Sequence, residues 1–244
     1  MKAIILAAGK GTRLDGAAVK PKCLVEIGGI TLLQRQIESL KDANIKRIVI
    51  VVGFGAGSIR EECGSDITFV ENVHYAETSS LYSLWLAREH LGEGFVVLNC
   101  DVLFHPQLLA NLLESAHDDA LLLSDTDTTQ LGDEEMKVKL KEGLVIDISK
   151  DMDPLEADGE NVGIVKFSAR GAQALVGYMD QLIASGAKKD WAPRAFREFA
   201  LNHSLHALST GGLPWIEIDF PEDYQRAVTE VYPKIEIAAF SRFG

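Results

Sequence analysis

The sequence predicts an α/β fold: a Rossmann-like, doubly wound sheet that is mixed but mainly parallel. Three apolar runs support this prediction, at residues 2–8, 46–53 and 94–101. Consecutive apolar positions are typical of strands that helices cover on both faces, and helical patterns separate the three runs. Ligands of such sheets bind beyond the carboxyl ends of the strands. Gly9, Gly53 and Asp101 lie at these ends.

The first half of the chain alternates between strands and helices. Thr31 and Gln34 form a capping-box pattern that begins a helix, whose apolar face includes Leu33, Ile37 and Leu40. Further elements are expected at residues 59–63 (helix), 67–70 (strand), 81–91 (helix), 106–116 (helix) and 120–124 (strand). Each of the three long apolar strands is therefore followed by a helix, as a doubly wound sheet requires.

The pattern changes at about residue 126. An alternating run at 136–141 meets residues 144–148 across the turn Glu142-Gly143, which is a hairpin signal. The elements expected after it are a strand at 159–167, a helix at 169–184, a helix from about 190, a strand at 213–219 and a helix from Pro221 to 231. No break in composition marks a linker, so we expect one domain over residues 1–244 with a small β-rich lobe in its second half.

Composition and charge exclude several classes of protein. The chain has 244 residues, 47% of them hydrophobic, and a formal net charge of −12. An acidic surface argues against nucleic acid or an anionic membrane as the main partner. Three cysteines form no CxxC pair, which favours reduced thiols, and no apolar run approaches the roughly 18 residues of a membrane span. We therefore expect a cytoplasmic protein with no nucleic-acid or membrane partner.

A basic, glycine-containing loop follows the first strand. From Lys10 to Lys22 it carries four cations, Lys10, Arg13, Lys20 and Lys22, against one carboxylate, Asp15. A loop of exposed amides with Lys and Arg side chains is typical of a polyphosphate site. The alternative is a basic, solvated turn.

Two known phosphate-binding patterns do not fit this loop. Ala17 stands where the Walker pattern needs a lysine, and Leu14 replaces the third glycine of the dinucleotide fingerprint. A second glycine pair, Gly53 and Gly55, is a weaker dinucleotide candidate, because Ser58 occupies the third glycine position. We therefore expect the phosphates of a ligand at the first loop.

The pattern that does fit has two parts, Leu6-Ala-Ala-Gly-x-Gly-Thr-Arg13 and Pro21-Lys22. It closely resembles the signature of the nucleotidyltransferases that join a nucleoside triphosphate to a phosphorylated small molecule and release pyrophosphate. The resemblance implies catalytic roles for Lys22 and Arg13. The residues implied for nucleotide binding are Leu6, Ala7, Ala8, Gly9, Lys10, Gly11 and Thr12. The polar connection before the helix at 81–91 adds Asn72, Ser79 and Ser80, either as nucleobase contacts or as turn and cap residues.

Two aspartates are candidates for a metal site. Nucleotidyl transfer needs charge neutralisation more than covalent help, and Mg²⁺ prefers oxygen ligands. Asp101 and Asp219 end predicted strands, and Glu217 lies on the same strand face as Asp219 and is the second choice. Either aspartate is also compatible with a helix cap. The resemblance places a metal-binding aspartate at both positions.

Three further segments indicate a branch of the family. Residues 72–88, 158–167 and 215–223 look like the cytidylyltransferases that act on phosphocholine, 2-aminoethylphosphonate or inositol 1-phosphate. They look less like the sugar-1-phosphate enzymes, which carry Gly-Thr at the position of Ser79-Ser80, or the molybdenum-cofactor guanylyltransferases. The resemblance implies CTP as the donor. It also implies a nucleotide-binding part at residues 1–125 and, at 126–244, an acceptor-binding part with the second metal carboxylate.

The expected acceptor is a small phosphorylated or phosphonylated alcohol or amine, with phosphocholine and 2-aminoethylphosphonate as first choices. Lys137, Lys139 or Lys150 would hold its phosphate, and Glu160 would add a carboxylate. Trp191 beside Asp190, or Tyr178 and Trp215, would face an ammonium group. Each is also compatible with core packing or a solvated surface. Alternative functions are an inositol-1-phosphate or sugar-1-phosphate nucleotidylyltransferase and a non-catalytic nucleotide-sensing domain. The apolar segment 235–243 is compatible with a homodimer.

Overall fold

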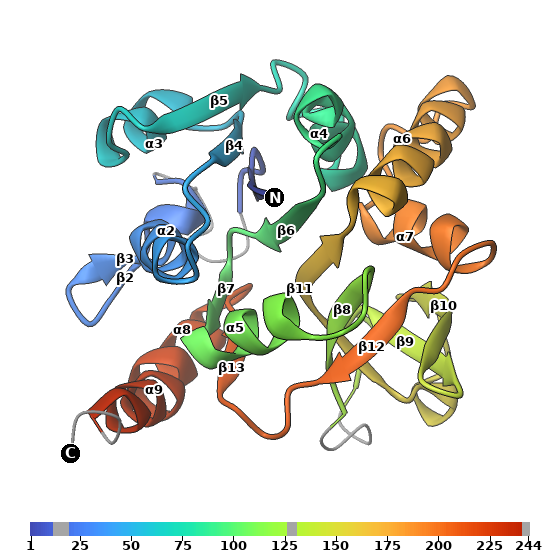
Figure 1. Cartoon of the computed structure of the whole chain (residues 1–244). Helices are drawn as coiled ribbons and strands as arrows, with labels where there is room; N and C mark the ends of the chain where they lie inside the picture. The colour runs from blue at the N-terminus through green and yellow to red at the C-terminus, as the bar shows by residue number, and fades with distance from the viewer. Residues whose placement is uncertain (12–19, 126–130, 241–244) are drawn as a thin grey trace.

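The computed structural model describes residues 1–11, 20–125 and 131–240 of the chain. Its centre is a nine-stranded sheet in the order β5-β4-β1-β6-β11-β8-β12-β10-β9 (Figure 1). The first four strands are parallel: β5 (Ile67–Glu71), β4 (Ile48–Val52), β1 (Lys2–Ala7) and β6 (Phe95–Asn99). This half confirms the expected parallel sheet.

The other half of the sheet is mixed. β11 (Gly159–Phe167) runs antiparallel to both β6 and β8 (Ala120–Ser124), and β12 (His206–Ser209) is parallel to β8. The predicted hairpin is present as β9 (Lys137–Lys141) and β10 (Leu144–Ser149). It forms the outer edge of the same sheet, so the β-rich part of the chain shares the core of the parallel part.

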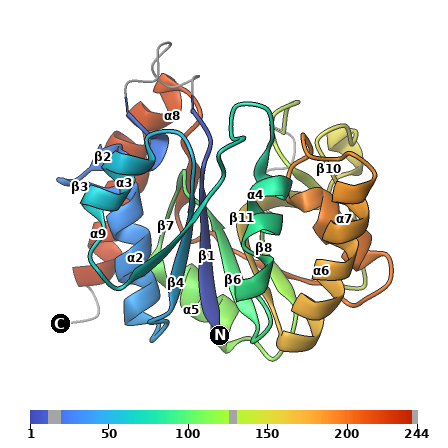
Figure 2. The ribbon, with the colours of Figure 1, turned by 90° about the horizontal axis from the view of Figure 1, so that it is seen from above.

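Helices cover both faces of the sheet (Figure 2). On one face lie α2 (Leu32–Asp42), α3 (Ala56–Glu62) and α5 (Pro106–Glu114). On the other lie α4 (Ser80–Leu86), α6 (Ala169–Ala184) and α7 (Pro193–Ala200). Within β1, Ile4 and Leu6 pack toward α4, whereas Ala3, Ile5 and Ala7 pack toward α2. This alternation explains the consecutive apolar residues, and it confirms the doubly wound fold.

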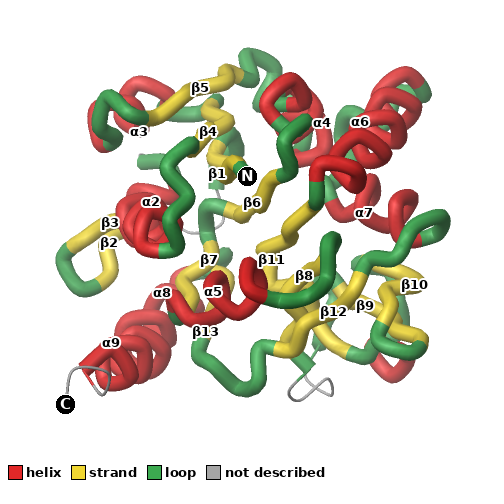
Figure 3. The backbone as a smooth tube through the Cα atoms, in the orientation of Figure 1, coloured by secondary structure: helices red, strands yellow, loops and turns green. Residues whose placement is uncertain are grey.

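Two short ribbons lie beside the main sheet. β2 (Glu26–Ile27) pairs with β3 (Ile30–Thr31), and β7 (Val102–Phe104) pairs with β13 (Trp215–Glu217). Figure 3 shows β7 and β13 side by side near α8 (Pro221–Arg226), which continues through a π-helical turn (Ala227–Val231) into α9 (Tyr232–Phe240). A separate apolar cluster that includes Ile216, Ile218 and Ile235 joins β13 to these helices.

Several predicted boundaries differ from the structure. The helix expected at 81–91 ends at Leu86, and a 3-10 turn (Arg88–His90) follows; Leu91 is buried all the same, so the apolar spacing fits both forms. The strand expected to end at Asp101 ends at Asn99, which leaves Asp101 in the turn before β7. Asp219 likewise lies beyond the end of β13. The capping box of Thr31 and Gln34 is confirmed. None of the described helices has the length and apolar character to cross a membrane.

Candidate active site

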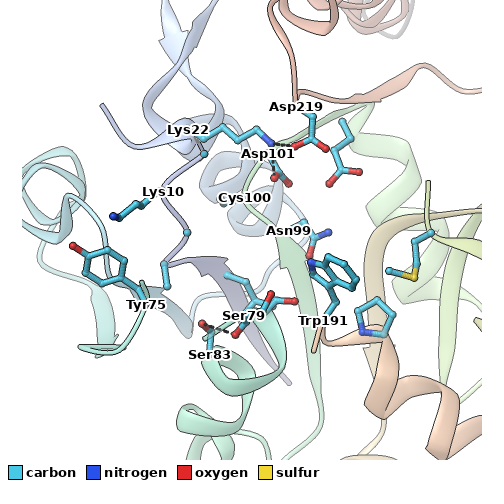
Figure 4. A pocket seen from close by; sticks show the side chains of 18 of the residues that line it. Lys10, Lys22, Tyr75, Ser79, Ser83, Asn99, Cys100, Asp101, Trp191 and Asp219 are labelled. Carbon is cyan, nitrogen blue, oxygen red and sulfur yellow. Dashed lines mark hydrogen bonds and ion pairs between the residues drawn. The ribbon is translucent and has the colours of Figure 1, made fainter. Parts of the chain in front are cut away.

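A cavity of about 380 Å³ opens at the carboxyl ends of the parallel strands (Figure 4). Segments that follow β1, β5 and β6 form one part of its wall. The rest is formed by β11, by the end of β13 and the residues after it, and by the segments before β9, after β10 and before α7. Of the residues predicted to bind nucleotide, the cavity is lined by Leu6, Ala8, Gly9, Lys10, Gly11, Asn72, Ser79 and Ser80. Ala7 faces the opposite side of the sheet, because neighbouring side chains of a strand alternate. Thr12 and Arg13 lie outside the described residues.

Glycines hold the two parts of the basic loop together. Gly11 has a φ of +59°, and a Cβ atom there would lie 2.8 Å from the Cβ of Lys22. Gly55 has a φ of +62° and packs against the ring of Pro21, so any side chain at Gly55 would collide with that ring. The second glycine pair therefore supports the segment that carries Lys22, a packing role that explains Gly55 without a dinucleotide.

Backbone pairing brings the predicted metal carboxylates together. Glu217 of β13 pairs with Val102 of β7, and the Ile218 amide donates to the carbonyl of Asp101 at 3.0 Å. From α2, the buried Gln36 donates through Nε2 to the carbonyls of Asn99 (2.9 Å) and Val102 (3.0 Å) and so fixes the turn. Ligand atoms of Asp101, Glu217 and Asp219 consequently lie within 4.8 Å of one another.

Lys22 lies between two of these carboxylates (Figure 4). Its Nζ is 2.9 Å from Oδ2 of Asp101 and also donates to Oδ1 of Asp219. Burial alone would lower the pKa of Lys22, but the charges and hydrogen bonds of both aspartates outweigh it and raise that pKa above its ordinary value. Burial raises the pKa of Glu217 to about 8, and the charges of Asp101 and Asp219 add to this effect.

The carboxylate cluster fits a divalent cation. Oδ1 of Asp101 is buried and has no hydrogen-bond partner among the described residues, an arrangement that is unfavourable for a carboxylate oxygen without a cation. Three carboxylates provide the hard oxygen donors that Mg²⁺ takes. The residues predicted for the metal site are thus suited to that ion.

The polar wall before α4 is organised by Asn72. Its Nδ2 donates to the hydroxyls of Thr78 (3.0 Å) and Ser83 (3.1 Å), and its Oδ1 accepts from the amide of His74 (3.0 Å). The hydroxyl of Ser80 accepts from the amide of Ala192 at 2.8 Å. For Asn72 and Ser80 these bonds match the turn interpretation, since they fix the loop that shapes the cavity.

The predicted acceptor residues separate into three places. Lys150 and Trp191 line the cavity, with Lys150 Nζ 4.7 Å above the indole ring and 3.3 Å from Oε2 of Glu134. Glu160 lines a neighbouring cavity of about 340 Å³ that shares Glu134, Glu217 and Asp219 with the first. Lys139 lines neither cavity; its ammonium is 3.6 Å from Oδ2 of Asp158 and donates to the carbonyl of Glu156 at 2.5 Å.

Comparison with known proteins assigns the family. A family model described as the MobA-like NTP transferase domain matches residues 3–193. The chain belongs to this family. The resemblance inferred from the basic loop is thereby confirmed, and with it the expectation of a nucleotidyltransferase enzyme.

Relatives within the nucleotidyltransferase family differ in substrate. A bifunctional IPC transferase and DIPP synthase of Rubrobacter xylanophilus is 27% identical over 225 residues, which are 91% of this chain and 50% of that protein. A choline-phosphate cytidylyltransferase of Streptococcus pneumoniae is 28% identical over 237 residues, 93% of this chain and 96% of that protein. A CMP-5'-(3-aminopropyl)phosphonate synthase of Streptomyces rubellomurinus is 32% identical over 130 residues, 51% of this chain and 21% of that protein.

A solved structure supports the same assignment. The CTP:phosphocholine cytidylyltransferase of Streptococcus pneumoniae superposes with a TM-score of 0.74 at 26% identity, over 92% of this chain and 96% of that one. The chain spans about half the length of the bifunctional relatives that it matches. Family membership thus fixes the fold and the class of chemistry.

Sequence reasoning missed several residues of this nucleotidyltransferase cavity. Tyr75, Asn99, Glu134, Met136 and Asn161 all line it. Asn99 ends β6 two residues before Asp101, so its position at the end of a parallel strand was a usable signal. Tyr75, which has Lys10 Nζ 5.9 Å from its ring centre, and Met136 lie in irregular segments that carry no such pattern.

Proposed function

We propose that the protein is a Mg²⁺-dependent cytidylyltransferase that transfers CMP from CTP to a small phosphorylated or phosphonylated alcohol or amine and releases pyrophosphate. The observation that carries this proposal is the meeting of Lys22 with Asp101, Glu217 and Asp219 in one cavity beside the glycine loop. Cations for a triphosphate and oxygen ligands for its metal are the two main requirements of such a transfer.

CTP as donor is supported by the relatives. The Streptococcus pneumoniae enzyme, a choline-phosphate cytidylyltransferase, matches nearly the whole chain, and the Streptomyces rubellomurinus relative is named as the synthase of a CMP-linked phosphonate. The loop that Asn72 organises closes one end of the cavity with small polar side chains, including Ser79 and Ser83.

The transfer itself needs alignment and charge neutralisation. An acceptor phosphate oxygen attacks the α-phosphorus of CTP and forms a new P–O bond. The bond from the α-phosphorus to its β-bridging oxygen breaks, and pyrophosphate leaves with the electron pair. Because the attacking oxygen is already ionised, no general base is required. Lys10 and Lys22 bind phosphate oxygens. Asp101 and Asp219, with Glu217 beside them, would hold Mg²⁺, which would supply further positive charge.

The acceptor part of the cavity favours a substrate with charges of both signs. It carries the ammonium of Lys150, the carboxylate of Glu134, and the face of Trp191, which is 48% exposed. Phosphocholine and 2-aminoethylphosphonate bring an anion and a cation, so both find complementary groups here. A polyol phosphate is an anion without a cationic group, so it brings no partner for the carboxylate of Glu134. Lys139 has no role in this proposal because it lines neither cavity.

A matrix of substrates tests the proposal. Five nucleoside triphosphates are paired with phosphocholine, 2-aminoethylphosphonate, inositol 1-phosphate and glucose 1-phosphate, and pyrophosphate release is measured. We expect the highest rate for CTP with one of the first two acceptors, and loss of the Mg²⁺ dependence of nucleotide binding in Asp101→Ala. Preference for glucose 1-phosphate with another triphosphate would assign a sugar nucleotidylyltransferase. Nucleotide binding without turnover on any pair would assign a sensing domain and overturn the enzymatic proposal.

A further inference from the structure

The ammonium of Lys22 lies between two of the carboxylates that are predicted to bind metal. Its ammonium bonds both Asp101 and Asp219, and the lysine is only 8% exposed. These are two of the three carboxylates whose oxygens converge within 4.8 Å. An ammonium and a divalent cation placed between the same carboxylates repel each other. The two cations are therefore alternative occupants of this cluster.

The backbone of Lys22 is held in place, whereas its side chain has a second possible binding partner, the triphosphate. Pro21 packs against Gly55, the stem of Lys22 passes against Gly11, and a 3-10 turn (Lys22–Leu24) begins at the lysine. Gly11 belongs to the loop assigned to the triphosphate, so the flexible stem lies beside the expected phosphates. The four-carbon stem of a lysine is flexible, so a phosphate bound at this loop would lie beside a side chain that can turn toward it without a change in the backbone.

Lys22 satisfies the cluster only in part. It binds Oδ2 of Asp101 and leaves the buried Oδ1 of the same residue without a partner among the described residues. A metal ion can bind oxygens of all three carboxylates at once, whereas the ammonium of Lys22 bonds one oxygen of Asp101 and one of Asp219. Lys22 thus stabilises the carboxylate cluster less than a metal ion does. The metal ion displaces it when a phosphate is present to pair with the ammonium.

We propose that Lys22 is a tethered cation that excludes divalent metal from Asp101 and Asp219 until a triphosphate draws it away. Metal alone then binds weakly, and metal and nucleotide bind cooperatively. The coupling is reciprocal, so metal strengthens nucleotide binding by the same factor. The inference rests on the proposed function in taking a nucleoside triphosphate as a substrate and Asp101 and Asp219 as metal ligands; it is independent of the base and of the acceptor.

Mn²⁺ titration of the whole protein without nucleotide tests this exclusion. Electron paramagnetic resonance of free Mn²⁺ reports binding without any turnover. We expect Lys22→Met to bind Mn²⁺ at least about tenfold more tightly than the unmodified protein, a factor within the usual range of coupling between sites. Lys10→Met is the matched control, because Lys10 lines the same cavity and bonds neither aspartate. We expect it to change Mn²⁺ affinity by less than about threefold, since an exposed charge is well screened.

Three outcomes overturn the inference. They are unchanged or weaker Mn²⁺ binding in Lys22→Met, equal tightening in Lys10→Met, and tight Mn²⁺ binding by the unmodified protein that nucleotide does not strengthen. Should Lys22→Met not fold, Lys22→Gln takes its place, and calorimetric titration of the unmodified protein with the best-binding triphosphate, with and without Mn²⁺, decides by itself. Coupling below about threefold there contradicts the proposal. Because no acceptor is present, a wrong acceptor assignment leaves the result unaffected.

Discussion

Replacing Glu160 by glutamine should make the protein more stable at neutral and alkaline pH. Burial raises the pKa of Glu160 to about 7, the charge of Glu135 adds to the rise, and Lys137 and Lys150 oppose it. The folded protein therefore keeps this carboxyl protonated over a pH range in which the unfolded chain ionises it. Glutamine has nearly the same shape and no charge to bury.

The size of the effect follows from the shift. The pKa of Glu160 rises from an ordinary value of 4.5 to about 7 on folding. This rise corresponds to a change in the free energy of unfolding of about 3 kcal/mol at most. Because the folded pKa is raised, the stability linked to protonated Glu160 is fully present below pH 4.5 and is lost as the pH rises through 7. The stability gained by Glu160→Gln, relative to the unmodified protein, should therefore grow across this window and level off above it.

Urea denaturation at pH values from 4 to 8.5 measures this difference, and Glu156→Gln supplies the matched control. Glu156 is exposed in the turn before β11 and loses the same charge, so we expect no trend with pH for it. A difference between Glu160→Gln and the unmodified protein that stays constant from pH 4 to 8.5 would refute the burial of this carboxyl. A trend of equal size in Glu156→Gln would assign the effect to net charge.

Three further predictions concern the cavity. Lys22→Ala should lower turnover roughly 100- to 1000-fold with an unchanged circular dichroism spectrum; a near-normal rate would remove it from the site. Trp191→Ala should raise KM for a cationic acceptor by about 3- to 30-fold and leave KM for CTP unchanged. Steady-state kinetics in which each substrate is varied in turn measures both values. Equal shifts in the two KM values would contradict an acceptor role for Trp191. Gly55→Ala should destabilise the fold by about 1–2 kcal/mol in urea titration, because alanine disfavours its φ of +62° and collides with Pro21; an unchanged midpoint would contradict this.

The main elements were predictable because local patterns determine them. The apolar run of β1 identifies a strand covered on both faces, and its alternation in the structure confirms this interpretation. The capping box at Thr31 and Gln34 needs only residues three positions apart. Asp101 and Asp219 were expected to meet because the carboxyl ends of strands in one sheet lie at the same edge; they do meet, but Asp219 follows β13, which belongs to the separate ribbon with β7. Their roles as metal ligands stay predictions.

The contacts that complete the site depend on distant parts of the chain. Nζ of Lys150 lies 4.7 Å from the centre of the Trp191 ring. The two residues meet because α7 packs on β10, a contact that no local sequence pattern predicts. Gln36 reads as an ordinary helix residue, yet its side chain fixes the turn that carries Asp101. Glycine at position 55 suggested a dinucleotide loop, whereas its neighbour in space is Pro21. Long-range packing decides each case, so a single sequence does not reveal it.

The second half of the carboxylate cluster lies outside the segment that assigns the family. The family model covers residues 3–193, whereas Glu217 and Asp219 come later in the chain. They reach the cavity because β13 pairs with β7 and because Asp223 at the start of α8 accepts from the amides of Asp219 (3.1 Å) and Phe220 (2.9 Å). The short ribbon and α8 thus act as a support that is separate from the main sheet. Two of the three carboxylates of the cluster therefore depend for their position on the ribbon and α8 rather than on the main sheet.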